Sequence, residues 1–161
     1  MNMKKLINIL TGLAVMVIAA VSCAKEDQGL SVKSVDSTLV GDWHLTDTKV
    51  EGEVVTETAD VYLSIMADGK FELYQKYSSQ LRYTLYTGTC WSENGLLKGL
   101  YSDNTSWATS YIPYIIGTKL ILKTYDLMEE MTFEKKSLSE AEKADADVWT
   151  KSSAIDYSPI L

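Results

Sequence analysis

The chain has 161 residues, the size of one folded domain, and its 46% hydrophobic and 23% charged residues exclude disorder along its whole length. Fifteen basic against 22 acidic residues give a net charge of −7, which argues against a nucleic-acid-binding surface. One histidine and two cysteines are too few for a Cys/His zinc site, so we expect no nucleic acid partner and no metal.

Residues 1–22 have the pattern of a bacterial secretory signal. A lysine pair precedes an apolar stretch over residues 6–20, which is shorter than the ~20 residues needed to span a bilayer. The sequence Ala-Val-Ser-Cys that follows looks like a lipobox, in which Cys23 becomes the new N-terminus and carries a diacylglycerol and a fatty acyl chain such as palmitate. Two alternatives stay open: cleavage after Ala24, which gives a freely secreted protein, and an uncleaved anchor helix.

Residues 23–38 are predicted to be the lipidated cysteine and a flexible, polar tether. Within it, Lys25, Glu26 and Asp27 resemble the acidic export signal of lipoproteins sent to the cell surface in Bacteroidetes-type bacteria. The other interpretation is a plain solvated linker. The prediction is an outer-membrane lipoprotein of the cell envelope whose membrane contact is its lipid; surface exposure follows only if the export signal operates.

Residues 39–136 are predicted to form an all-β domain, because apolar and polar residues alternate and turn signals recur at short intervals. Asp68-Gly69 and Asn94-Gly95 are tight-hairpin signals, and we expect a β-bulge at Gly88. The predicted strands span residues 43–50, 60–66, 71–77, 82–92, 96–102, 107–115, 119–125 and 131–136. Eight strands with short connections favour an antiparallel up-and-down meander that closes into a β-barrel; an open sandwich is the alternative.

Residues 137–161 are predicted to be a short C-terminal helix and a tail. Ser137 and Glu140 have capping-box spacing, and Glu, Ala and Lys residues follow. The sequence places a helix of two or three turns over residues 138–148, with a thin apolar stripe that can lie on the barrel wall. Residues 149–161 receive no assignment.

Gly41-Asp42-Trp43 resembles the Gly-x-Trp motif of lipocalins, in which the tryptophan plugs the closed end of the barrel. With the short motifs that follow it as far as residue 136, the chain resembles the mostly uncharacterised lipocalin-like lipoproteins of Bacteroidetes-type bacteria. These motifs include Asp68-Gly69-Lys70-Phe71, Gly88-Thr89-Cys90-Trp91, Gly99-Leu100-Tyr101-Ser102-Asp103 and Thr132-Phe133-Glu134-Lys135. The resemblance implies a lipocalin or calycin-like barrel. One departure is that the last strand has no arginine to stack over Trp43.

Residues that could carry chemistry are few, and we expect no enzyme and no cofactor. His44 adjoins Trp43 on a strand and should point to the opposite, solvent-facing side, and no nucleophile-elbow or metalloprotease motif is present. The carboxylate pairs lie in turns. Cys90 is expected to be a small buried residue of the core.

The aromatic residues of the middle and late strands are the most informative group. Tyrosine and tryptophan offer flat apolar area with a polar group, which suits amphiphiles and sugars; the alternative is that they fill the core. The candidate ligand-lining residues are Tyr83, Trp91, Tyr101, Trp107 and Tyr111. The favoured function is binding of a small apolar or amphipathic ligand, or a glycan, inside the barrel. The alternative is a non-catalytic surface interaction or inhibitor module with a filled barrel and an unknown protein partner.

Overall fold

The computed structural model describes residues 33–56, 59–150 and 158–161. The predictions for the signal peptide, Cys23 and Lys25–Asp27 lie outside these ranges. Among the described residues, no helix is long and apolar enough to cross a membrane. The elements in chain order are η1 (Ser37–Leu39), β1 (Gly41–Val50), β2 (Glu53–Val55), β3 (Ala59–Ile65), β4 (Lys70–Tyr77), β5 (Thr84–Glu93), β6 (Leu96–Tyr101), β7 (Tyr111–Ile116), β8 (Lys119–Thr124), β9 (Glu129–Lys135), α1 (Glu140–Ala144) and β10 (Asp147–Val148).

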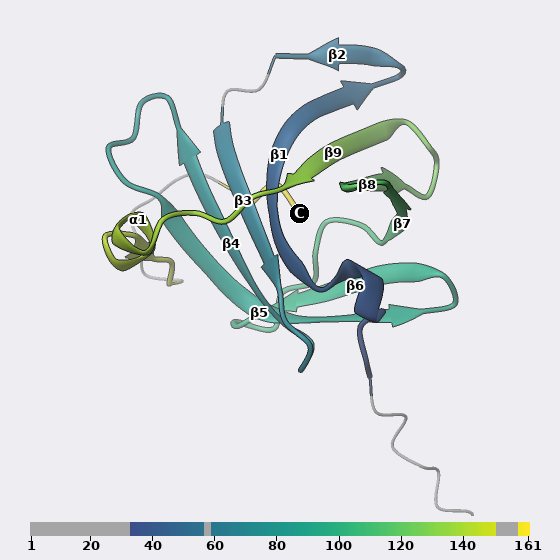
Figure 1. Cartoon of the computed structure of the whole chain (residues 1–161), viewed down its shortest axis with the longest axis horizontal. Helices are drawn as coiled ribbons and strands as arrows, with labels where there is room; N and C mark the ends of the chain where they lie inside the picture. Colours follow the sequence, from purple (N-terminus) through teal and green to yellow (C-terminus); the bar gives the residue numbers. More distant parts are fainter. Residues whose placement is uncertain (1–32, 57–58, 151–157) are drawn as a thin grey trace, which may run out of the picture. The chain divides into compact units, whose positions relative to one another are not determined.

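Eight strands form a closed antiparallel barrel (Figure 1). The chain runs around the ring in sequence order from β1 through β3 to β9, and β9 pairs with β1 to close it. The predicted up-and-down barrel is therefore confirmed. Two short strands stand outside the ring: β2 pairs with the end of β1, and β10 pairs in parallel with the start of β5.

The seam between β6 and β7 is the weakest pairing of the ring. The two strands share one register pair, Leu97 with Tyr111, and an isolated bridge joins Leu100 to Ser106. Pro113 lies in the middle of β7 and has no N–H group to donate to a neighbouring strand. Prolines in β-sheets are for this reason found mainly at strand edges that are not hydrogen-bonded. Pro113 thus limits the number of hydrogen bonds that β7 can form with β6.

The Gly-x-Trp resemblance implies that Trp43 plugs the closed end of the barrel, and the structure buries this side chain in the core beside η1. Its side chain is 1% exposed, and its indole Nε1 donates a hydrogen bond of 2.9 Å to the carbonyl of Leu39 in η1. Gly41 has φ of +146°, a conformation that L side chains rarely adopt. The ammonium of Lys135 in β9 lies 5.3 Å from the Trp43 ring, so a lysine cation stands over the tryptophan where no arginine is available.

The barrel unit begins earlier than predicted, because residues 33–38 pack against it. Val35 is buried in the core, and the Ser34 carbonyl accepts a hydrogen bond of 2.8 Å from the Ser92 N–H in β5. The Asp36 N–H donates to Ser92 Oγ at 2.9 Å. Burial of the Val35 side chain removes apolar surface from water, which stabilises the packed position of this segment over a solvated one.

The prediction of a bulge at Gly88 is wrong. Gly88 pairs in regular register with Phe71 on one side and Tyr101 on the other, and the irregularity of register in β1 lies between Leu45 and Asp47. A Cβ on Gly88 would lie 2.7 Å from Cε1 of Phe71 and would collide with the Leu100 carbonyl. The glycine therefore serves close packing.

The helix α1 is shorter than the predicted helix over residues 138–148, and its N-cap lies two residues after the predicted N-cap, Ser137. Ser139 is the N-cap: its Oγ accepts from the Glu142 N–H at 3.3 Å and donates to the Glu142 carboxylate at 2.6 Å. Ser137 instead donates a hydrogen bond to Asp42. Leu138 is the one anchor of the predicted apolar stripe that is buried, and it packs on the outer wall against Tyr62, Tyr74 and Tyr83.

Candidate functional site

The end of the barrel opposite Trp43 holds the candidate site, which we call the mouth. It is formed where β4 leads into β5, where residues 102–110 join β6 to β7, and where residues 125–128 join β8 to β9. Residues 158–161, which we call the cis segment, lie in the mouth, and Figure 1 shows the last residue of the chain within the ring of strands. The mouth is therefore occupied by the chain itself.

Gln75 is one of the polar residues that hold the cis segment, together with Tyr77 and Tyr101. The alternation of β4 directs it inward with Phe71 and Leu73, and its side chain is 1% exposed. Its Nε2 donates a hydrogen bond of 3.1 Å to the Ser158 carbonyl, and its Oε1 accepts one of 2.9 Å from the Ile160 N–H. Both groups of the buried amide are thus satisfied by the backbone of one short segment.

Leu161 places the end of the cis segment in the barrel core. Its side chain is 1% exposed and belongs to the main apolar cluster. The hydroxyl of Tyr101 donates a hydrogen bond of 2.7 Å to the main-chain oxygen of Leu161. Burial raises the pKa of Tyr101 well above its usual range, and the neighbouring hydroxyls of Tyr111 and Tyr86 add to this effect, so the Tyr101 hydroxyl stays a neutral donor.

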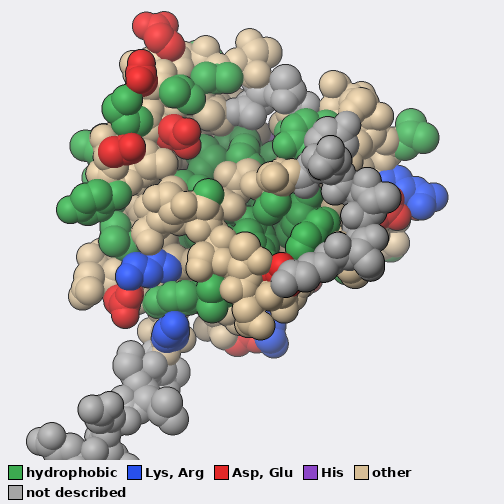
Figure 2. Space-filling model, turned by 180° about the vertical axis from the view of Figure 1, so that it is seen from behind, with side chains coloured by type: hydrophobic (Ala, Val, Ile, Leu, Met, Phe, Trp, Pro, Cys, Tyr) green, Lys and Arg blue, Asp and Glu red, His purple; other side chains and the backbone are tan. Residues whose placement is uncertain are grey.

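One cavity of about 430 Å³ lies on one side of the cis segment. Its walls combine aromatic rings with polar loop residues: Tyr86, Tyr101, Asp103, Thr105, Ser106, Ala108, Trp149, Ser158, Pro159 and Leu161. The rings of Tyr86 and Trp149 lie 5.7 Å apart. Seen from behind, the barrel unit shows hydrophobic side chains gathered in a hollow near the centre of the view (Figure 2). A volume of this size is in the range of small-molecule sites.

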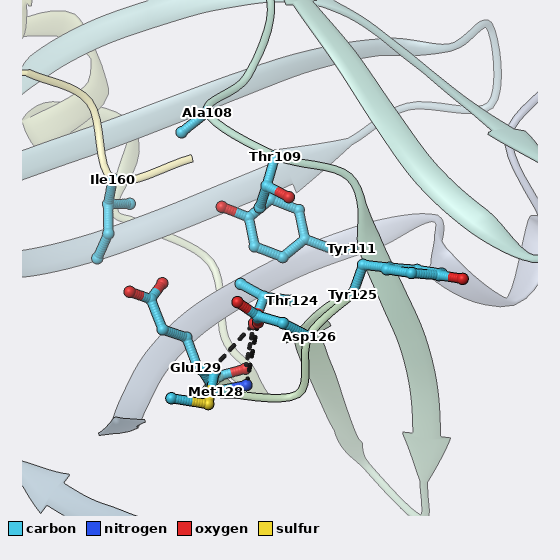
Figure 3. Close-up of a pocket in the computed structure, with 9 residues that line it drawn as sticks. All are labelled: Ala108, Thr109, Tyr111, Thr124, Tyr125, Asp126, Met128, Glu129 and Ile160. Atoms are coloured by element: carbon cyan, nitrogen blue, oxygen red, sulfur yellow. Dashed lines mark hydrogen bonds between the residues drawn. The ribbon is translucent and has the colours of Figure 1, made fainter. Parts of the chain in front are cut away.

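A second cavity of about 470 Å³ lies on the other side and is bordered by Ile160 (Figure 3). Its floor includes Tyr111 and Thr124. The Thr124 hydroxyl donates to Asp126 Oδ1 at 2.6 Å and accepts from the Glu129 N–H at 3.0 Å, which fixes the turn between β8 and β9. Burial, with a smaller contribution from the Glu129 carboxylate, raises the pKa of Tyr111 to about 12. This cavity is the more polar of the two in its lining residues.

Three of the five candidate aromatic residues lie inside the barrel. Tyr101 lines the cavity of about 430 Å³ and Tyr111 the one of about 470 Å³. Trp107 is buried and packs edge-to-face on Phe71, with ring centroids 5.1 Å apart, so it contributes to the core and to neither of these two cavities.

The other two candidates, Tyr83 and Trp91, lie on the outer wall. Because Gly88 causes no shift of register, Cys90 points inward and Trp91 outward, where the Lys33 ammonium lies 3.7 Å from its ring. Tyr83 belongs to the outer cluster around Leu138 and donates a hydrogen bond of 2.5 Å to Asp60. Neither residue lines the mouth.

His44 lies on the outer wall, on the side opposite Trp43, as predicted. Its Nε2 is 2.8 Å from Asp60 Oδ1, and its ring stacks on Tyr62 with centroids 4.3 Å apart. Burial opposes ionisation of Asp60, but hydrogen bonds from Tyr83 and His44 outweigh it and lower the pKa of this carboxyl. The arrangement ties β1, β3 and the connection that leads into β5 together on the outer wall.

The candidate ligand-lining residues predicted from the sequence did not include Gln75, Tyr86, Trp149 or the cis segment. Gln75 could have been found, because it follows Phe71 and Leu73 at alternate positions and is a polar residue on an inward face. Nothing in the local pattern of residues 158–161 indicates a partner 83 residues earlier in the chain.

Cys90 and the acidic groups offer no reactive cluster in the described ranges. Burial raises the pKa of the Cys90 thiol to about 12, so the group is protonated at neutral pH. Within residues 33–56, 59–150 and 158–161, no three His, Cys, Asp or Glu side chains lie close enough together to hold a metal ion.

Comparison with known proteins gives distant likenesses of structure. No protein-family description matches the sequence, and no curated protein matches it. A lipoprotein YedD from Klebsiella pneumoniae is 12% identical, with a TM-score of 0.46 over 70% of this chain and 84% of that one. A DUF4847 family protein from Bacteroides vulgatus is 12% identical, with a TM-score of 0.42 over 62% of this chain and 94% of that one. These likenesses say nothing of a ligand or partner.

Proposed function

We propose that this protein is a lipid-anchored, lipocalin-like barrel of the outer membrane that binds a small apolar or amphipathic molecule in its mouth. The observation that carries the proposal is the pair of cavities, of about 430 and 470 Å³, on the two sides of the cis segment. Both cavities are open to solvent, and open cavities of this size lined by aromatic residues with a few polar groups are typical of small-molecule sites. The role is binding and not catalysis.

The lining residues suit a ligand with both apolar and polar parts. In the cavity of about 430 Å³, Tyr86 and Trp149 supply flat apolar walls, while Thr105 and Ser106 supply hydroxyl groups. Aromatic faces flanked by hydroxyls match the apolar face and the polar edge of a lipid headgroup, an acyl amide or a sugar.

Ligand binding is tested by native mass spectrometry of residues 24–161, before and after exposure to a bacterial lipid and glycan extract. We expect a stoichiometric adduct that is lost on denaturation and whose mass identifies the ligand class. A clean unliganded peak in both spectra would contradict the proposal.

Membrane anchoring is tested with the two cysteines of the chain. In the Cys23→Ser variant we expect the protein to leave the membrane fraction, because the sulfur that takes the diacylglycerol is gone. The matched control is Cys90→Ser, which changes a buried thiol and leaves the anchor intact. Equal membrane retention of both variants would contradict lipidation at Cys23. Protease treatment of whole cells then distinguishes surface exposure, the role proposed for Lys25, Glu26 and Asp27, from a periplasmic position.

A surface interaction module is the second candidate, and one observation favours it. Tyr114, Ile115 and Ile116 of β7 are consecutive apolar residues with 44%, 39% and 61% of their surfaces exposed. Contiguous exposed apolar residues mark contact sites more often than isolated exposed apolar residues do. Crosslinking in intact cells tests it: a specific partner lost in the Ile116→Lys variant supports this function, and a monomer with no crosslinked partner contradicts it.

A further inference from the structure

The cis segment is bound in the mouth as a peptide ligand would be. In an extended chain, the carbonyl of one residue and the N–H of the residue two positions later point to the same side. The Ser158 carbonyl and the Ile160 N–H form such a pair, and both bond to the amide of Gln75. A side-chain amide offers one donor group and one acceptor, so Gln75 recognises backbone and not a particular side chain.

The polar groups of the mouth are arranged for backbone groups. Gln75 is 1% and Tyr101 6% exposed, and the Tyr101 hydroxyl bonds to the main-chain oxygen of Leu161. If the cis segment left, the amide of Gln75 would lie in the barrel with these two bonds broken, and an unpaired buried polar group is unfavourable. The vacated mouth therefore favours a ligand that restores the same bonds over one that is merely apolar.

Space lies on both sides of the cis segment. Ile160 borders the cavity of about 470 Å³, and Ser158, Pro159 and Leu161 border the cavity of about 430 Å³. Both cavities are open to solvent, so the barrel does not enclose the cis segment on all sides. Pro159 also fixes one backbone angle of the segment, which lowers the entropy lost when it binds in extended form.

We infer that the mouth is a binding site for an extended peptide, and that residues 158–161 occupy it in cis until such a peptide displaces them. The recognised pattern is a backbone carbonyl, an N–H two residues later and an apolar side chain at the next position, where Leu161 now lies. This inference rests on the proposed function, because it names the chemical class of the ligand in the same site.

The test compares binding of one peptide to two forms of residues 24–161. The probe is acetyl-Ser-Pro-Ile-Leu-amide, which reproduces residues 158–161, and calorimetry measures its dissociation constant. We expect a form that ends at residue 157 to bind the peptide at least tenfold more tightly than the form with residues 158–161, because the cis segment no longer competes. Circular dichroism checks that the shortened form is folded.

A matched peptide isolates the hydrogen bond to Gln75. N-methylation of the isoleucine nitrogen removes the N–H and leaves the side chains unchanged, and we expect it to weaken binding to the shortened form about tenfold or more. In a shortened Gln75→Leu form, the plain and the methylated peptides should bind equally. Dodecanoate, an apolar probe without an amide, should bind the Gln75→Leu form at least as tightly as the form with Gln75, because it cannot pair the Gln75 amide.

The outcomes separate this inference from the proposed function. If the folded, shortened form binds dodecanoate but not the peptide, the mouth is a site for apolar molecules and the peptide inference is overturned. If it binds neither, both proposals are overturned. Where the shortened form does not fold, the full-length Leu161→Ala variant replaces it, since it keeps the backbone bonds and loses the apolar anchor. Peptide binding by that variant supports the inference, and no binding shows that residues 158–161 are a permanent plug.

Discussion

The indole of Trp107 lies directly on Gly99, and the backbone N–H of Trp107 donates a hydrogen bond of 3.0 Å to the Gly99 carbonyl. A Cβ at position 99 would lie 2.5 Å from Cδ2 and 2.7 Å from Cζ2 of the indole. The absence of a side chain at Gly99 therefore allows Trp107, in the loop between β6 and β7, to pack in the core.

The Gly99→Ala variant should be destabilised by about 1–3 kcal/mol, because the added methyl group overpacks a filled interior. Urea unfolding measures the change in the free energy of unfolding. Gly117→Ala is the matched control: nothing lies within 4 Å of its Cβ, and only its φ of +61° opposes the substitution. A Gly99→Ala protein at least as stable as the control would show that Trp107 can leave this position at little cost.

The Trp43→Phe variant should lose about 1–3 kcal/mol of stability, because the Leu39 carbonyl would be left buried without the indole donor. The control is Trp91→Phe, on the outer wall and partly exposed, which should cost less. Thermal melts of the two variants give the comparison. Equal losses would contradict the role of Trp43 as the plug of the closed end.

Cys90 should resist thiol reagents in the folded protein. Because burial raises its pKa to about 12, the nucleophilic thiolate is scarce at pH 8, and the side chain is 2% exposed. In a Cys23→Ser background, we expect a disulfide reagent to label Cys90 only after denaturant is added. Stoichiometric labelling of the native protein within minutes would mean that the barrel opens readily beside β5.

Asp42 should contribute a pH-dependent part of the stability. Burial opposes its ionisation, but hydrogen bonds from Ser137 and Ser64 outweigh burial, so the pKa of Asp42 in the folded state lies below its ordinary value of 3.8. A lowered folded-state pKa means that this stabilisation is present above pH 3.8 and is lost as the pH falls below it. The Asp42→Asn variant should show a flatter decline of unfolding free energy in this acid range. An unchanged acid profile would contradict the assignment.

The barrel itself was predictable from the sequence because its signals are local. Alternation over residues 60–66 and 71–77 gave β3 and β4 to within a residue, and Asp68-Gly69 forms the hairpin between them with Gly69 at φ of +81°. Such patterns depend on neighbours in the chain, and short connections then leave few topologies open.

The candidate site was less predictable because it is assembled over long separations in the chain. Which aromatic residues face inward depends on parity, and Tyr83 and Trp91, which have the same parity, were both assigned to the wrong face. The contact of Gln75 with Ile160 joins residues 85 positions apart, and no periodicity encodes it. Tyr101 and Tyr111 lie inside the barrel and line the two cavities, but whether they contact a ligand stays a prediction.

The two-residue strand β10 has a consequence for the behaviour of the protein at high concentration. The first residues of β5 are not paired with β6, so without β10 they would present unsatisfied backbone groups to other chains. The Asp147 N–H donates to the Tyr83 carbonyl at 2.9 Å, and Arg82 holds Asp145 and Asp147 at 3.3 and 3.7 Å. Free strand edges of this kind template intermolecular β-pairing. The Asp147→Pro variant lacks that N–H donor, and light scattering should show that it self-associates. By pairing with the start of β5, β10 thus protects this strand edge from pairing with other chains.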